Sequence, residues 1–327
     1  MSYFYKENKE LEEKVNRYFG GLADFNNKHF GGKLSVVLLG SLSRGEGSWI
    51  NESGRDILVS DIEFFTVYPE EISSLKEYDE FITSYAKEVF GENASSLFHA
   101  DNSYVLKSRL KLMEKKLLTY DAVHFGKCVV GEDVMPLFPK IDIHNINLYD
   151  IRDILTHRVF SVLYYGFPLK EQGKEPEYRY CLAKNSLDLM TVLLVENGIL
   201  ESGFINRYNK IKELSIDEKI KDYFGYCLSL KLGEPYDTFF TTEEMESIFI
   251  SLVKELNRNF KFKAENILSN IRHIVRRRLG MLKRALKYKN FAFSKPHLNR
   301  LIASFDKREN ITEKVIKDNL VLNGYPV

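Results

Sequence analysis

Residues 38–48 read LLGSLSRGEGS, and residues 60–68 read SDIEFFTVY. The first stretch ends an apolar run at Gly40-Ser41, and the second sets Asp61 and Glu63 one residue apart inside another apolar run. Short runs of branched apolar residues that stop at turn residues predict two buried strands. Because residues i and i+2 of a strand point to the same face, Asp61 and Glu63 are expected to project side by side.

Two neighbouring carboxylates repel each other, so they need basic partners or a divalent cation unless the strand face is simply solvated. Mg²⁺ prefers oxygen ligands and is commonly held by one or two carboxylates together with substrate phosphates. Gly40-Ser41 offers backbone N–H groups and a hydroxyl for phosphate oxygens, and glycine permits close approach of a ligand. The two features together favour metal-assisted transfer of a phosphoryl or nucleotidyl group.

These stretches resemble the signature of the DNA polymerase β-like nucleotidyltransferase superfamily: a strand, Gly-Ser, a short helix, and a strand with two acids one residue apart. The resemblance covers residues 34–135. It implies an α+β core, a mixed sheet with flanking helices, that binds two Mg²⁺ ions and transfers a nucleoside monophosphate from a triphosphate, expected to be ATP. It also implies that Gly40, Ser41 and Arg44 contact the triphosphate, although an ordinary exposed arginine on a short helix is the simpler interpretation of Arg44. Two departures are Glu63, where aspartate is commoner, and a longer segment before Asp61, which contains WINESGRDIL.

The resemblance further implies a third metal-binding acid on a later strand. Asp101, in SLFHADNSYVL, is the first choice, and Asp121, in LLTYDAVHFGKCVVGED, is the alternative. For either residue the simpler interpretation is a helix cap or a turn. Helical domains of this superfamily often lend a lysine to the nucleotide, and Lys184 is the candidate here, against the simpler interpretation of a solvated helix lysine.

The pattern of apolar residues changes near residue 145. Short strand-like runs are common before this point, and after it apolar residues recur mainly at helical spacing. We therefore expect a nucleotidyltransferase core over 1–145 followed by an all-α helical domain over 146–327. Helices are expected over 7–29, 70–91, 148–166, 178–198, 243–260 and 264–288, strands over 33–40, 55–69 and 95–106, a turn, strand and loop over 116–133, and a polar loop over 167–179.

Composition suits a globular protein: 327 residues, 44% of them hydrophobic, with a formal net charge of +1. The polar N-terminal stretch and the lack of a long uncharged apolar run lead us to expect a protein without a signal peptide or a membrane partner. Three scattered cysteines show neither metal-ligand spacing nor a disulfide framework, which favours a reducing cytoplasm. Basic residues gather over 254–295, which could attract nucleic acid or triphosphate, although such runs are more often solvated helix faces.

The leading hypothesis is a Mg²⁺-dependent enzyme that transfers a nucleoside monophosphate to a hydroxyl of a small molecule, such as a sugar or an aminoglycoside, and releases pyrophosphate. Asp61, Glu63 and Asp101 would hold the metal. A protein or RNA acceptor, or a second nucleotide as in oligonucleotide synthesis, are alternatives. A non-catalytic module that binds nucleotide or RNA is a further alternative, which the presence of both Asp61 and Glu63 argues against.

Overall fold

The computed structural model describes residues 2–52, 54–95, 98–146 and 148–259. The helix expected over 264–288, and most of the basic run over 254–295, lie outside the described residues. Among the helices that are described, none is both long and apolar enough to cross a membrane.

The chain forms two compact units, each built from two separate segments. Of the described residues, unit 1 combines those up to Ile151 with Met190–Phe240, and unit 2 combines Arg152–Leu189 with those from Thr241 onward. Unit 1 thus reaches past residue 145 and takes in a later part of the chain. A domain boundary at residue 145 stays a prediction.

Unit 1 is built around a four-stranded mixed sheet with the order β5-β4-β1-β6. Strand β1 (Ser35–Leu38) runs antiparallel to both β4 (Ile62–Tyr68) and β6 (Lys127–Val130). Strand β5 (Ala100–Leu106) runs parallel to β4. The mixed sheet with many helices confirms the α+β class expected from the sequence.

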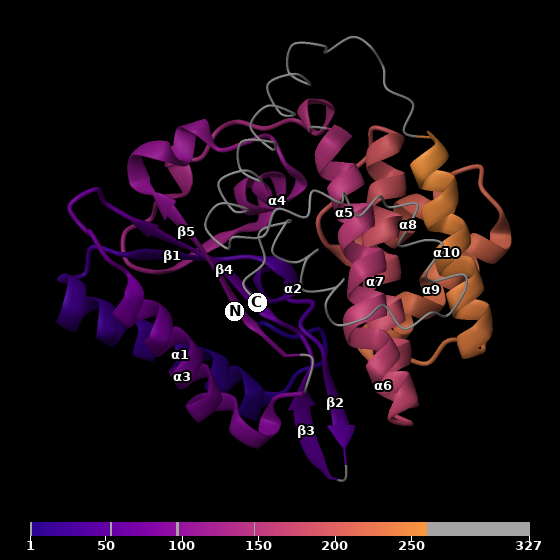
Figure 1. Cartoon of the computed structure of the whole chain (residues 1–327), viewed down its shortest axis with the longest axis horizontal. Helices are drawn as coiled ribbons and strands as arrows, with labels where there is room; N and C mark the ends of the chain where they lie inside the picture. Colours follow the sequence, from indigo (N-terminus) through magenta and orange to yellow (C-terminus); the bar gives the residue numbers. More distant parts are fainter. Residues whose placement is uncertain (1, 53, 96–97, 147, 260–327) are drawn as a thin grey trace, which may run out of the picture. The chain divides into compact units, whose positions relative to one another are not determined.

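Alternating residues of β1 and β4 fill two different hydrophobic clusters. Val36 and Phe64 join the cluster formed with α1 (Lys9–Phe30) and α3 (Lys76–Phe90), which lie side by side in Figure 1. Val37 and Phe65 join the second cluster, which includes Ala122 of α4 (Leu117–Phe125). Both faces of the sheet are therefore covered, and the alternation fixes which face each neighbouring residue of β4 must take.

Helix α1 continues without a break through Gly20-Gly21. Gly21 lies against α3 so closely that a Cβ atom there would overlap the ring of Tyr85. A glycine in a helix interior costs about 1 kcal/mol of helix stability relative to alanine. Here that cost is offset by the close approach of two helices that form one wall of the core.

The run over 55–69 was expected to be one strand, and this expectation is wrong. Strand β3 (Arg55–Leu58) pairs with β2 (Trp49–Glu52) in a separate two-stranded hairpin, and β4 begins only at Ile62. Between them the Ser60 hydroxyl accepts a hydrogen bond from the backbone N–H of Ser48 (2.8 Å). That contact turns the chain out of one sheet and into the other just before Asp61.

Two further segments differ from expectation. Residues 117–125 form helix α4 rather than a turn and strand, and β6 follows it; periodicity alone does not separate short apolar helices from strands. The expected polar loop over 167–179 instead holds α6 (Phe167–Glu171) and the start of α7 (Glu175–Glu196). Pro176 lies in the first turn of α7, where no backbone N–H is needed. Pro168 comes directly after a π-helical turn over Val162–Gly166.

The remaining helical elements complete the two units. They are α2 (Gly40–Arg44), α5 (Leu148–Ser161), a π-helical turn over Val162–Gly166, α8 (Gly203–Glu213), α9 (Glu218–Leu232), α10 (Thr242–Asn259), and 3₁₀ turns over Gly91–Asn93, Lys107–Leu112, Met135–Leu137 and Ile143–Asn145.

His157 on α5 makes unit 2 sensitive to acid. Burial, with the positive charges of Arg158 and Lys184, lowers the pKa of His157 to about 3. Its unfolded pKa is about 6.5, so between these values the unfolded chain binds a proton that the folded chain does not. The free energy of unfolding must therefore fall as pH falls below about 6.5, by at most about 1.4 kcal/mol per pH unit from this group.

We predict that His157→Gln removes this part of the pH dependence. Urea unfolding of both proteins at a series of pH values between 7 and 4 gives the measurement. The difference in unfolding free energy between variant and wild type should shift in favour of the variant as pH falls. Parallel pH profiles for the two proteins would contradict the assignment.

Candidate active site

Three carboxylates meet at one end of the β4–β5 pair. Asp61, Glu63 and Asp101 each offer one oxygen atom, and these atoms lie within 4.8 Å of one another. Asp61 directly precedes β4, Glu63 lies in β4, and Asp101 lies in β5, where the parallel register sets it opposite Glu63. The structure therefore brings together the acid pair and the first-choice third acid.

Asp61 is tied to the neighbouring strand by backbone contacts. One Asp61 carboxylate oxygen accepts a hydrogen bond from the N–H of His99 (3.2 Å), and the N–H of Ile62 donates to the carbonyl of His99 (2.9 Å). The carboxylates of Asp61 and Glu63 are half-buried, and that of Asp101 is exposed. The Asp61 carboxylate is thus held by a backbone contact, whereas the Asp101 carboxylate is accessible to solvent.

The donor set fits Mg²⁺. The ion prefers oxygen ligands in a compact shell and keeps positions open for substrate phosphates, which three carboxylates from two strand ends would allow. Three carboxylates this close also repel one another, so a divalent cation between them would relieve that repulsion. The role of the three residues as metal ligands and catalytic groups remains a prediction at this point.

Gly40 lies directly against the acid pair. Its φ is +67°, in the left-handed region that favours glycine, and a Cβ atom there would overlap the carboxylate of Glu63. The N–H of Leu39 donates to the carbonyl of Glu63 (2.7 Å), which holds β4 beside the strand end. Gly40 starts the short helix α2, so the Gly-Ser turn and the acid pair are neighbours in space as well as in the predicted motif.

Three serines form a short series of hydrogen bonds that begins at Ser41. Ser41 donates to the hydroxyl of Ser60 (3.4 Å), which in turn accepts from the N–H of Ser48 (2.8 Å). Ser60 immediately precedes Asp61. These contacts connect the predicted phosphate-binding serine to the chain that carries the first acid.

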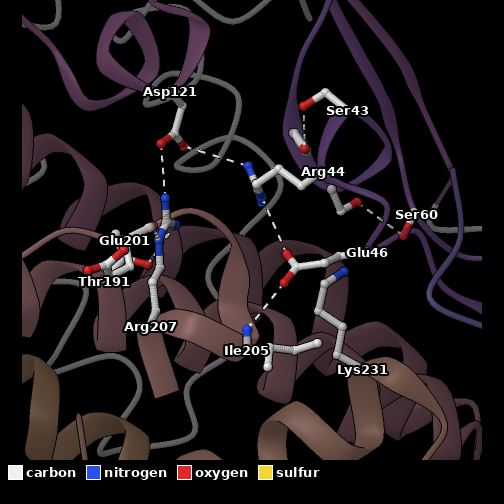
Figure 2. A network of polar contacts seen from close by, with 12 residues as sticks. Ser43, Arg44, Glu46, Ser60, Asp121, Thr191, Glu201, Ile205, Arg207 and Lys231 are labelled. Carbon is white, nitrogen blue, oxygen red and sulfur yellow. Dashed lines mark hydrogen bonds and ion pairs between the residues drawn. The ribbon is translucent and has the colours of Figure 1, made fainter. Parts of the chain in front are cut away.

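Arg44 has partners that the sequence did not suggest. Only 6% of its side chain is exposed; its Nε donates to Glu46 (3.3 Å), and its Nη1 lies 3.9 Å from the carboxylate of Asp121 (Figure 2). This placement favours a structural role for Arg44 over contact with a triphosphate. Asp121, the alternative third acid, lies on α4 and is paired with Arg44 and with Arg207 (2.9 Å) instead of joining the acid group.

Lys184 lies half-buried on α7 within unit 2, whereas the acid group lies in unit 1. A role for Lys184 in nucleotide binding stays a prediction.

Lys231 is a candidate that sequence reasoning missed. It lies in the last turn of α9 with 3% of its surface exposed, and its Nζ is 3.4 Å from the hydroxyl of Ser48 and 5.6 Å from the centre of the Phe204 ring. In the described part of the chain it has these partners but no ion pair. The sequence gave no signal, because a lysine just before a terminating glycine is an ordinary end to a helix.

We predict that Gly40→Ala weakens metal binding, because the added methyl group must displace the Glu63 carboxylate. Gly31→Ala is the matched control: Gly31 has a φ of +61° and nothing within 4 Å of its added Cβ. Both variants carry the same backbone strain of about 1–2 kcal/mol, but only the first disturbs the acid group. Mn²⁺ titration of each variant should show lowered affinity for Gly40→Ala alone, and equal affinities would contradict the close contact.

No protein-family model and no curated protein matches the chain. The chain is similar to the crystal structure of a spectinomycin adenyltransferase from Enterococcus faecialis, solved with ATP and spectinomycin. The two share 15% sequence identity over 75% of this chain and 99% of that chain, with a TM-score of 0.46. The functional proposal depends on this chain's own residues.

Proposed function

We propose that this protein is a Mg²⁺-dependent nucleotidyltransferase that moves a nucleoside monophosphate from a nucleoside triphosphate, expected to be ATP, to a hydroxyl group. The meeting of Asp61, Glu63 and Asp101 at one end of the β4–β5 pair supports this proposal most strongly. The position of Gly40-Ser41 against that group adds a place for phosphate oxygens beside the metal ligands. Mg²⁺ held there would neutralise charge on the phosphates and polarise the reacting phosphorus.

The proposed transfer needs only the two substrates and a carboxylate of this chain to accept a proton. The acceptor oxygen forms a bond to the α-phosphorus, the bond from that phosphorus to the bridging oxygen breaks, and pyrophosphate leaves with the bonding electrons. The proton of the acceptor hydroxyl passes to a carboxylate. Asp101 suits that task because it is the exposed member of the acid group, while Asp61 and Glu63 are held further inside.

The phosphate side of the site would be supplied by Ser41 and Lys231. Three buried cations surround the ring of Phe204, each with its charged centre 5.3–5.6 Å from the ring centre: Arg44, Lys231 and Arg207. Two carboxylates, Glu46 and Asp121, pair with the arginines of this group. One positive charge is therefore in excess, and we assign it to Lys231 because the two arginines are paired. Contacts through Ser48 and Ser60 connect Lys231 to Ser41, the Ser48–Ser60 contact being made by the backbone N–H of Ser48.

The acceptor is proposed to be a small hydroxylated molecule of the sugar or aminoglycoside kind, as the sequence resemblance implies. Protein, RNA and nucleotide acceptors are the alternatives. An assay with each α-labelled triphosphate, Mg²⁺ or EDTA, and a panel containing aminoglycosides, simple sugars, total tRNA and the protein itself distinguishes them by which component becomes labelled. Binding of triphosphate without metal and without release of pyrophosphate would favour a non-catalytic module.

We predict that Asp61→Asn abolishes transfer while the protein remains folded. Loss of a charged metal ligand should lower kcat by at least about 100-fold, beyond the usual effect of residues that merely support ligands. Asp24→Asn, an exposed aspartate on α1, is the matched control and should keep wild-type activity. Pyrophosphate release measures the rate, and transfer by Asp61→Asn at the wild-type rate would refute the assignment.

We also predict that Lys231→Met weakens use of the triphosphate without lowering the stability of the protein. The variant keeps an apolar contact with Phe204 but loses the charge, so kcat/KM for the triphosphate should fall about 10- to 100-fold, the worth of one charge-assisted hydrogen bond. Its melting temperature should not fall, because a buried cation without an ion pair is costly to the folded state. A lower melting temperature with unchanged kcat/KM would show that the lysine is purely structural.

A further inference from the structure

A closed ring of polar contacts lies at the C-terminal end of α2 (Figure 2). Arg44, the last residue of α2, pairs with both Glu46 (3.3 Å) and Asp121 (3.9 Å). Asp121 accepts a hydrogen bond from Nη2 of Arg207 (2.9 Å), and Glu46 accepts one from the backbone N–H of Ile205 (3.2 Å). Because Arg207 and Ile205 both belong to α8, the ring closes through one turn of that helix.

Arg207 is held in a single orientation by its partners within unit 1. Its side chain is 2% exposed, its Nη1 donates to the hydroxyl of Thr191 (3.1 Å), and its Nε donates to the carbonyl of Glu201 (2.9 Å). All three nitrogen atoms of the guanidinium group are thereby used. A group fixed in this way holds Asp121 in place and cannot readily exchange it for another partner.

Glu46 is fitted equally closely to the start of α8. Gly203, the first residue of that helix, has a φ of +76°, and a Cβ atom there would overlap the Glu46 carboxylate. The carboxylate thus occupies the N-terminal end of an 11-residue helix, where its negative charge is stabilised by the helix dipole and by the N–H of Ile205.

The ring and the acid group are connected by one short helix. α2 has five residues, with Gly40 against the Glu63 carboxylate at one end and Arg44 in the ring at the other. The N–H of Glu46 also donates to the carbonyl of Ser41 (2.9 Å), which ties the ring back to the first turn. A shift at Arg44 is therefore transmitted to Gly40 over little more than one helical turn.

We propose that Asp121 and Arg207 are positioning residues: through Arg44 and Glu46 they hold α2 in the place where Gly40 confines the Glu63 carboxylate. They touch neither metal nor substrate, and they act by limiting where α2 can move. A role of these two residues in catalysis rests on the proposed function. The confinement of the Glu63 carboxylate by Gly40 does not depend on any activity.

The test is Asp121→Asn, which keeps the shape of the side chain and removes its charge. Mn²⁺ affinity, measured by titration with electron paramagnetic resonance of the free ion, should fall about tenfold, the lower end of the effect of mutating residues that support metal ligands. Amide hydrogen exchange, measured on the metal-free protein, should rise in peptides that cover residues 38–48 and stay near wild type in peptides that cover α1.

Asp188→Asn is the matched control. Asp188 is the carboxylate of another arginine pair, with Arg158 at 2.8 Å, and its side chain is 22% exposed where that of Asp121 is 19% exposed. This pair lies in unit 2, outside the ring. The control should leave both Mn²⁺ affinity and exchange over 38–48 unchanged.

Several outcomes decide the matter. Wild-type Mn²⁺ affinity and exchange in Asp121→Asn, or equal losses in Asp188→Asn, overturn the positioning role. If Asp121→Asn does not fold, Glu46→Gln takes its place, because glutamine still accepts from Ile205 but no longer pairs with Arg44. A wild-type protein that binds Mn²⁺ yet transfers no nucleotide overturns the proposed function alone. One that binds no Mn²⁺ overturns the metal site, and hydrogen exchange over residues 38–48 of the metal-free variants then decides this inference by itself.

Discussion

The parallel pairing of β4 with β5 is the constraint on which the candidate site depends. The register sets Glu63 opposite Asp101, and the hydrogen bonds around His99 place Asp61 at the start of the same pair. A parallel pair needs a crossover connection, and here it contains α3, which packs on α1. The packing of β4 and the position of the acids thus follow from one register, because a slip by one residue would turn the acids toward the cluster that contains Ile62 and Phe64.

Charge in unit 1 is divided between two neighbouring groups. Acids gather at the end of the β4–β5 pair, whereas cations gather around Phe204, and α2 lies between them with one end in contact with each group. Buried charges are costly unless they are paired. In the ring of Arg44, Glu46, Asp121 and Arg207, each charged side chain is paired with at least one of opposite charge. The same ring that satisfies these charges also restricts the helix between the two groups.

The sequence was most informative where the relevant contacts are local. The apolar runs and the i, i+2 spacing predicted β1, β4 and the shared face of Asp61 and Glu63, and family resemblance suggested Asp101. The break before Asp61 was missed because it depends on a serine contact with the hairpin, and α4 was missed because its apolar run fits either a helix or a strand. Lys231 and Arg207 escaped notice because their partners lie far away along the chain, and nothing in the neighbouring sequence marks a buried cation.

The division of unit 1 into two segments has a consequence for synthesis on the ribosome. Asp121 and Arg44 emerge early, but Arg207 belongs to the segment Met190–Phe240, which follows the whole of Arg152–Leu189. A nascent chain that ends before α8 would therefore contain the sheet strands and the acid group without the helix that closes the polar ring. The N-terminal half cannot mature as a finished block ahead of the rest, as domains made of one continuous segment commonly do. The last steps of its folding must wait for a piece of chain that is translated after part of the other unit.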